Sequence, residues 1–131
     1  MKNRKRKVLV IDDDLKHLFT AQSLLEEEGY QVITHRNGFG ATTLIKESRP
    51  DLVLIDINMP GLSGEKLSKV ILSFHALKDI SIFFYSSNDE DSLRRSVAKY
   101  GVAGYICKGD ILNLKRKVFE YLGQLPILPE N

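Results

Sequence analysis

The chain has 131 residues, of which 43% are hydrophobic and 27% charged, as in ordinary globular domains. This length suits one domain with its own core, and the single cysteine excludes an internal disulfide framework and fits a reducing cytoplasm. No apolar run approaches the length of a membrane span, so we expect no membrane insertion and a cytoplasmic location.

Positive charge is concentrated at the N-terminus. The first seven residues hold five of the 19 Lys and Arg and no acid, so the remainder carries 14 basic against 17 acidic residues. We interpret residues 1–6 as a basic arm, 7–123 as the folded domain and 124–131 as an extended C-terminal tail. A short basic arm could contact nucleic acid or an anionic surface, but it is more often a solvated end leading into a strand, so nucleic acid is not expected as a partner.

Five apolar runs read as strands, and a helical pattern follows each of them. The expected strands are 7–11, 30–35, 52–55, 80–85 and 103–107. The expected helices run from the cap at Asp14 to Gly29, from Gly38 to Arg49, onward from Ser63, over 89–100 and over 111–122. This alternation predicts an α/β fold, a doubly wound five-stranded parallel sheet in the flavodoxin-like order 2-1-3-4-5 with five helices.

Apolar residues recur at helical spacing in the expected helices. The first helix shows Leu15, Leu18, Phe19 and Leu25, with Gln22 at the same spacing, and the third shows Leu67, Val70, Ile71 and Phe74. Such spacing predicts one face packed on the sheet in each helix.

Polar side chains follow four of the expected strands. Asp12 and Asp13 end the first, Asp56 the third, Ser86 the fourth and Lys108 the fifth. Because the carboxyl ends of parallel strands lie along one edge, and strands one and three are neighbours in this order, we expect these groups to converge in one pocket.

Three neighbouring carboxylates repel one another unless a cation lies among them. A divalent ion such as Mg²⁺ prefers oxygen ligands and leaves room for phosphate oxygens. A lysine and a hydroxyl beside such an ion suit the charge that develops during phosphoryl transfer. Asp56 is then the expected nucleophile, forming an acyl phosphate.

Four segments carry a resemblance to a known family. They are V-L-V-I-D-D-D at 8–14, D-L-V-L-I-D-I-N-M-P-G-L-S-G at 51–64, I-S-I-F-F-Y-S-S at 80–87 and G-V-A-G-Y-I-C-K at 101–108. In this order and spacing they resemble the receiver domain of two-component response regulators, here of the stand-alone, single-domain type. The resemblance covers essentially the whole chain. It implies phosphorelay signalling rather than an enzyme with other substrates.

The resemblance also implies roles for particular residues. Asp56 would accept a phosphoryl group from a histidine kinase or a histidine phosphotransfer protein. Asp12, Asp13, Asp56 and the backbone carbonyl of Asn58 would hold Mg²⁺ or Mn²⁺, Lys108 would pair with the phosphoryl group, and Ser86 and Tyr105 would act as the switch.

The output surface implied by the resemblance is formed by strands four and five with the helices at 89–100 and 111–122. A downstream protein would bind there, or two copies of the chain would form a dimer. Basic residues on both helices fit a binding face and fit equally a solvated one with local ion pairs.

Two positions depart from the family pattern. Gly109 stands where a proline joined by a cis bond usually follows the lysine, so we expect Lys108–Gly109 to be trans. Tyr85 replaces a smaller aliphatic residue, and its ring is expected near the helix at 89–100. The three histidines, His17 among them, lack metal-ligand spacing and are interpreted as surface or satisfied residues.

Two other functions stay open at this stage. A degenerate receiver could serve as a constitutive interaction or dimerisation module, with Gly109 as its main support. A hydrolase of phosphoesters is a weaker alternative, because Asn58 stands where a second acid would follow Asp56.

Overall fold

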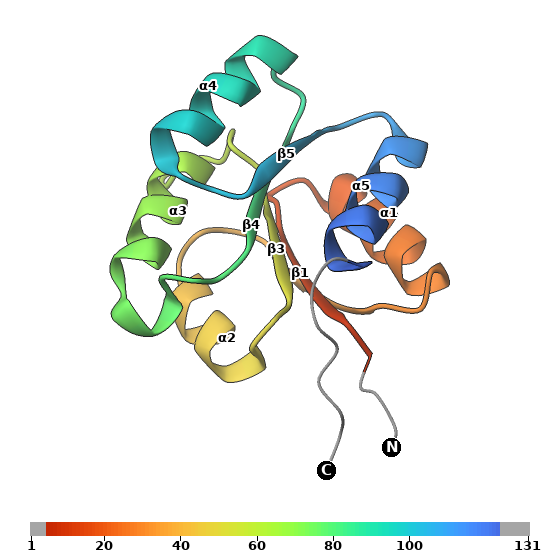
Figure 1. Cartoon of the computed structure of the whole chain (residues 1–131), viewed down its shortest axis with the longest axis horizontal. Coiled ribbons are helices and arrows are strands. Elements are labelled where there is room, and N and C mark those ends of the chain that lie inside the picture. The colour runs from red at the N-terminus through yellow and green to blue at the C-terminus, as the bar shows by residue number, and fades with distance from the viewer. Residues whose placement is uncertain (1–4, 124–131) are drawn as a thin grey trace.

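The computed structural model describes residues 5–123 (Figure 1). In chain order the elements are β1 (Lys7–Ile11), α1 (Leu15–Glu27), β2 (Gln31–His35), α2 (Ala41–Ser48), β3 (Leu52–Ile55), α3 (Gly64–Ser73), the 3₁₀ helix η1 (His75–Leu77), β4 (Ile82–Ser86), α4 (Glu90–Tyr100), β5 (Gly104–Cys107) and α5 (Ile111–Gly123). The expected extended tail, and most of the expected basic arm, lie outside the described residues. No helix among residues 5–123 is long and apolar enough to cross a membrane.

The strands form one five-stranded parallel sheet in the order β2-β1-β3-β4-β5, which confirms the predicted topology. Helices α1 and α5 cover one face, and α2, α3 and α4 cover the other (Figure 1). Ile11 pairs with Ile55, so the carboxyl ends of β1 and β3 lie side by side. The residues that follow these two strands therefore begin next to each other.

Each face of the sheet has its own core, because side chains of a strand alternate between the faces. In β3, Leu52 and Leu54 belong to the α1/α5 core, whereas Val53 and Ile55 belong to the core under α2, α3 and α4. All four β3 side chains are fully buried, which explains why this strand is a continuous apolar run rather than an alternating one.

Polar caps fix where the helices begin. The Asp14 carboxylate accepts the backbone N–H of Lys16 at 2.9 Å, as expected of an N-terminal cap. Ser63 caps α3 and Asp89 caps α4 in the same way. These caps start α1, α3 and α4 close to the carboxyl edge of the sheet, so the loops that carry the polar residues stay short.

The helical periods are correct, but not all of their apolar residues are buried. In α1, Leu18 and Leu25 are buried, whereas Leu15 is 55% exposed and Phe19 71% exposed. Val70 and Phe74 at the outer edge of α3 are also exposed. The apolar stripe on these helices is thus wider than the face that the sheet covers.

Some boundaries differ from the prediction. Helix α2 begins at Ala41 rather than Gly38, because Gly40 adopts a left-handed conformation (φ 80°) that a helix cannot include. Strand β4 begins two residues later than expected and extends through Ser86. Ser86 is therefore held in the sheet rather than in the loop beyond it.

Candidate functional site

A tight loop after β3 positions the backbone of Asp56. The backbone N–H of Gly64 donates to the carbonyl of Ile57 at 2.9 Å, which brings the start of α3 against the strand end. A Cβ atom placed on Gly64 would lie 2.1 Å from the carbonyl oxygen of Asp56. Only glycine allows this approach, so Gly64 is part of what positions the Asp56 backbone.

The three predicted carboxylates converge. Asp12 and Asp13 follow β1 and Asp56 follows β3, and each offers an oxygen within 4.8 Å of the other two. Asp12 is fully buried and Asp56 is 5% exposed. Asp13 is not buried, but two buried carboxylates this close to each other and to a third repel one another, which makes a cation at this place favourable.

Lys108 provides one positive charge at the site. Its Nζ lies 2.6 Å from Asp12 Oδ2 and 3.4 Å from Asp56 Oδ2, and its side chain is only 7% exposed. The backbone N–H of Lys108 donates to the carbonyl of Ser86 at 2.8 Å, which fixes the end of β5. Sequence reasoning thus placed Lys108 correctly, beside both carboxylates.

The environment of Asp56 disfavours its charge. Burial raises the pKa of Asp56 above its ordinary value, and Lys108 opposes this rise; the nearby Asp12 charge raises the pKa further. The net direction is upward, so one ammonium does not compensate for the desolvation and the neighbouring acid. A second cation would lower the pKa again.

The donor set fits a hard divalent ion. Asp12 Oδ2 accepts no well-oriented hydrogen bond from any described residue, although Lys108 Nζ lies close to it. A buried carboxylate oxygen with unused acceptor capacity and two further carboxylates are ligands of the kind that Mg²⁺ or Mn²⁺ takes. The backbone N–H of Asn58 donates to Asp56 Oδ1 at 3.3 Å, so Asn58 lies close to the same carboxylate.

Ser86 is fully buried and held by two amides. Its Oγ accepts hydrogen bonds from Asn58 Nδ2 and from the backbone N–H of Asn88, both at 3.3 Å. Asn58 Nδ2 also donates to Asn88 Oδ1 at 2.8 Å. The hydroxyl is thus bonded to this pair of asparagines, and among the described residues it has no hydrogen bond to Asp56.

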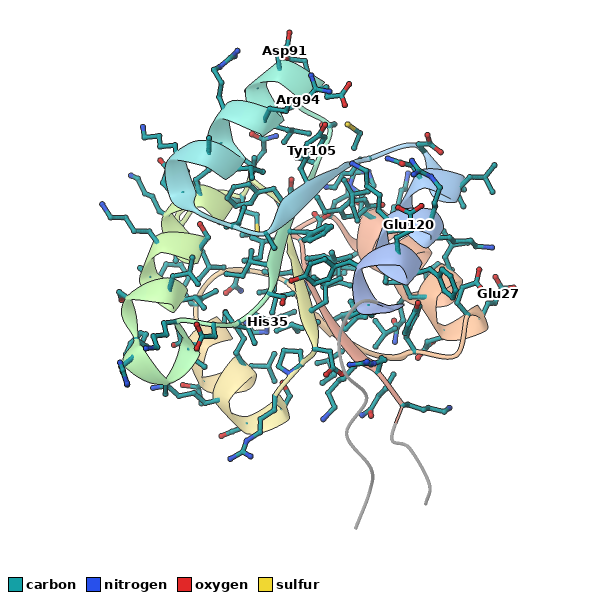
Figure 2. All side chains as sticks on the ribbon, viewed as in Figure 1. Glu27, His35, Asp91, Arg94, Tyr105 and Glu120 are labelled. Carbon is teal, nitrogen blue, oxygen red and sulfur yellow. The ribbon has the colours of Figure 1, made fainter. Side chains whose placement is uncertain are left out.

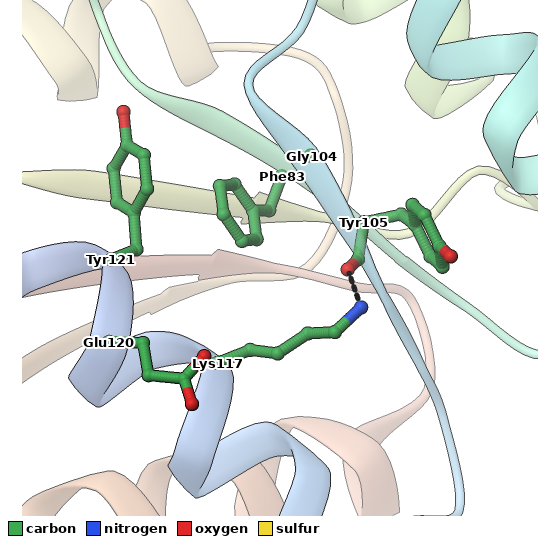
Figure 3. A pocket seen from close by; sticks show the side chains of 6 residues that line it. All are labelled: Phe83, Gly104, Tyr105, Lys117, Glu120 and Tyr121. Atoms are coloured by element: carbon green, nitrogen blue, oxygen red, sulfur yellow. Dashed lines mark hydrogen bonds between the residues drawn. The ribbon is translucent and has the colours of Figure 1, made fainter.

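Tyr105 lies on the outer surface of β5. Its hydroxyl donates to Glu90 Oε1 at 2.6 Å, at the start of α4. Figure 2 labels Tyr105 together with Arg94 of that helix. Lys117 donates to the Tyr105 carbonyl and lies 4.1 Å from the ring centroid (Figure 3). The hydrogen bond to Glu90 raises the pKa of Tyr105. Two contacts from neighbouring helices therefore hold the ring outward.

His17 is a member of the site that sequence reasoning did not place there. From the first turns of α1, its Nδ1 lies 3.0 Å from Lys108 Nζ and 3.7 Å from Asp12 Oδ2. The one sequence feature that could have indicated this position is its spacing of three residues from the N-cap Asp14. A side chain at that spacing lies on the same side of the helix as the cap and can point toward the end of the preceding strand. His17 Nδ1 thus lies at hydrogen-bond distance from the buried ammonium, in addition to the two carboxylates.

Removing that acceptor should weaken the fold slightly. We expect His17→Leu to lower the free energy of unfolding by about 1 kcal/mol in metal-free buffer, because the ammonium loses one hydrogen bond. His17→Gln, which keeps an acceptor, should lose less. Urea denaturation with a chelator present measures both, and equal losses in the two variants would contradict the assigned contact.

The two departures from the family pattern have clear outcomes. Tyr85 is 6% exposed and belongs to the α1/α5 core, so the expectation that it lies near α4 is wrong. Because side chains alternate along β4, Tyr85 shares the face of Phe83, opposite Phe84. Burial raises the pKa of Tyr85 to about 12. No peptide bond among the described residues is cis, so Lys108–Gly109 is trans as expected, and Gly109 has φ 91°.

Comparison with known families identifies the class of protein. The sequence model of the response regulator receiver domain matches residues 8–118, and the chain belongs to this family. The match spans the sheet from β1 to most of α5, including every residue of the candidate site.

Two relatives of similar sequence identity are covered by this chain to different extents. The polar-differentiation response regulator DivK of Brucella anthropi is 32% identical over 107 residues, which cover 79% of this chain and 84% of that protein. The response regulator GacA of Pseudomonas aeruginosa is 33% identical over 130 residues, covering 95% of this chain and 59% of GacA.

Solved structures show the same fold. A putative response regulator from Chloroflexus aurantiacus superposes with a TM-score of 0.85 at 23% identity, covering 92% of this chain and all of the other. The chemotaxis protein CheY4 of Vibrio cholerae gives a TM-score of 0.82 at 22% identity, with 89% of this chain and 98% of that chain covered. The Mn²⁺-bound form of response regulator Rcp1 gives 0.79 at 20% identity, covering 94% and 99%.

Proposed function

We propose that this chain is a phosphoacceptor switch in phosphorelay signalling, with Asp56 as the residue that receives the phosphoryl group. The observation that carries the proposal is the meeting of Asp12, Asp13 and Asp56 with the buried Lys108 at one edge of the sheet. The donor is a phosphohistidine of a histidine kinase or a histidine phosphotransfer protein.

In the transfer step, an Asp56 carboxylate oxygen attacks phosphorus as the bond between phosphorus and the donor's imidazole nitrogen breaks. The nitrogen keeps the electron pair of that bond, and the product is an acyl phosphate. Asp12, Asp13, Asp56 and the Asn58 carbonyl would hold Mg²⁺ or Mn²⁺, which when bound would supply positive charge beside the phosphoryl oxygens. Lys108 already contacts Asp56, so a short movement pairs its ammonium with the new group.

Phosphorylation then changes the contacts of Ser86 and Tyr105. The phosphoryl group adds strong acceptors and a charge of about −1.5 to −2. Ser86 leaves Asn58 and Asn88 and donates to it, and Tyr105 gives up its bond to Glu90 and turns inward. The change alters the β4/β5/α5 surface and the neighbouring α4, which binds a partner protein or a second copy.

The surface offers a defined contact point. A pocket of about 250 Å³ lies between β5 and α5 and is lined by Phe83, Gly104, Tyr105, Lys117, Glu120 and Tyr121 (Figure 3). The ring of Tyr105 is one of its walls, so turning that ring changes the pocket. The alternative of a constitutive module rests on Gly109, whose trans bond is compatible with Lys108 contacting both carboxylates.

The proposal is tested by intact mass after incubation with acetyl phosphate. We expect one phosphoryl adduct in Mg²⁺, none with a chelator, and loss of the adduct over time once the donor is removed. A protein that remains unmodified in excess Mg²⁺ at short sampling times would favour the constitutive module instead.

The Tyr105–Glu90 contact should oppose the switch. We expect Glu90→Gln to increase the affinity for beryllofluoride, a phosphoryl analogue, by roughly threefold, because the Tyr105 hydroxyl then bonds to a neutral amide rather than to a charged carboxylate, and this weaker bond opposes the switch less. Tyr105 lowers the pKa of Glu90, so this bond is present above the ordinary carboxyl pKa and is lost as the pH falls through the lowered one. Titration at neutral pH measures the change, with Asp91→Asn as control; equal affinities in wild type and Glu90→Gln would contradict it.

A further inference from the structure

Helix α4 is held on the sheet by few apolar side chains. All of its residues are described, and among them only one apolar side chain, Leu93, is buried, whereas α1, α2, α3 and α5 each bury two or three. An element with little buried apolar surface separates from the core at a low free-energy cost. Polar contacts therefore contribute a large share of what fixes α4 in its place.

One of these polar contacts joins α4 to α3, which lies beside it (Figure 1). The Ser96 hydroxyl, near the middle of α4, donates to Glu65 Oε2 at 2.5 Å, and Ser96 is only 9% exposed. A hydrogen bond accepted by a carboxylate is stronger than one between neutral groups, and shielding from water strengthens it further. The bond therefore fixes the distance between the two helices.

Glu65 is in turn fixed to the end of β3. It follows Gly64, the glycine that packs against the Asp56 carbonyl, and its own carbonyl accepts the Ser68 hydroxyl at 2.7 Å. Within residues 5–123, no lysine, arginine or histidine forms an ion pair with its carboxylate, so Ser96 is the protein group that this carboxylate binds. A short path thus connects the Asp56 backbone with the middle of α4.

The start of α4 is held by a different group. Glu90, its first residue, accepts the Tyr105 hydroxyl at 2.6 Å while the Tyr105 ring is turned outward. If that ring turns inward, Ser96 carries the remaining side-chain hydrogen bond between α4 and another element of the described chain. A helix that moves along α3 loses this bond as well, because a hydrogen bond tolerates only small displacements.

We propose that the Glu65–Ser96 hydrogen bond is a latch, which holds α4 in its place while Asp56 is unphosphorylated and opens when the switch responds. This inference rests on the proposed function and adds the pair of residues that resists the change. Glu65 acts through Ser96 and contacts no reacting group, so it is a positioning residue. The latch keeps the switched arrangement a minor population until a phosphoryl group at Asp56 favours it.

Titration with beryllofluoride in the presence of Mg²⁺ tests the latch in the full chain. Ser96→Ala should bind the analogue roughly tenfold more tightly than the wild type, because the variant loses a bond that only the unswitched state contains. Glu65→Gln keeps an oxygen that accepts the hydroxyl, so its affinity should rise less. The double variant should not exceed Ser96→Ala, because both substitutions act on the same contact.

Ser92→Ala is the matched control, because it removes a hydroxyl from the same helix one turn earlier. The Ser92 hydroxyl forms no hydrogen bond with any residue from 5 to 123, and the backbone N–H that binds the Asp89 cap is kept. Its affinity for beryllofluoride should equal that of the wild type. An increase as large as that of Ser96→Ala would overturn the latch, since the effect would then come from the loss of any hydroxyl on α4.

Urea denaturation with and without beryllofluoride separates a latch from a bond that only supports the fold. A latch predicts that Ser96→Ala lowers the urea midpoint without the analogue, and by much less when the analogue is saturating. Equal losses in both conditions, together with an unchanged affinity, would overturn the latch while the wild type still binds the analogue as the proposed function requires. A wild type that binds no beryllofluoride would contradict the proposed function and the latch together.

Discussion

Asp56→Asn is expected to abolish the acetyl phosphate adduct completely, while Mg²⁺-dependent labelling of the wild type proceeds. The amide has nearly the same shape as the carboxylate, but it is not a nucleophile at neutral pH and cannot form an acyl phosphate. Intact mass in parallel reactions measures the difference. A Ser87→Ala variant, at an exposed position beside the site, should label as the wild type does.

Asp56→Asn should be at least as stable as the wild type in metal-free buffer. Burial raises the pKa of Asp56, so the native state disfavours its charged form. For a raised pKa, the stabilising effect is complete below the unfolded-state value and is lost as the pH rises through the folded-state value. At neutral pH the charge is therefore a cost to the fold, and Asp56→Asn should unfold at an equal or higher urea concentration. A large loss of stability would mean that lost labelling reflects a damaged fold.

Gly64→Ala should destabilise the protein by at least about 3 kcal/mol, at the upper end of overpacking effects. The new Cβ would meet the Asp56 carbonyl carbon at 2.7 Å and Ile55 Cγ2 at 2.9 Å, besides the closer carbonyl oxygen. Two of these atoms belong to the backbone and cannot rotate away. The start of α3 must then move from the strand end, and Asp56 moves with it. Urea denaturation should show the loss, and phosphorylation should slow in whatever fraction remains folded.

Gly123→Ala is the matched control for this effect. It also places a methyl group on a helical glycine, but a Cβ there meets no atom of the described residues within 4 Å, and φ is not positive. Alanine is the better helix former, so its stability should be equal or slightly higher. If Gly64→Ala behaved in the same way, the close approach of α3 to Asp56 would be incorrect.

The sequence predicted the fold well because its signals are local and agree with one another. The apolar sequence of β3 is unbroken, which is typical of a strand that is covered on both faces. Asp14 is a capping residue and therefore indicates where the first helix begins. Parallel topology follows from the alternation, and the convergence of Asp12 and Asp56 follows from topology. This chain of steps needs no knowledge of side-chain packing.

Features that depend on packing were not predictable in the same way. The expectation for Tyr85 failed because it was based on helix proximity rather than on alternation along β4. Phe19 has the helical spacing of its buried neighbours, yet it is 71% exposed, at a hollow that Thr34 and Arg36 at the end of β2 also line. The place of His17 depends on a side-chain direction, which spacing alone does not determine.

Chemical mapping of the phosphorylated residue tests the central claim most directly. Reduction of the acyl phosphate with borohydride converts the modified aspartate to homoserine, and peptide sequencing by mass spectrometry then locates it. We predict a single modified position, Asp56, in protein treated with acetyl phosphate and Mg²⁺. Homoserine at Asp12 or Asp13, or a stable phosphoryl group on another residue, would contradict the assignment of Asp56 as the phosphoacceptor.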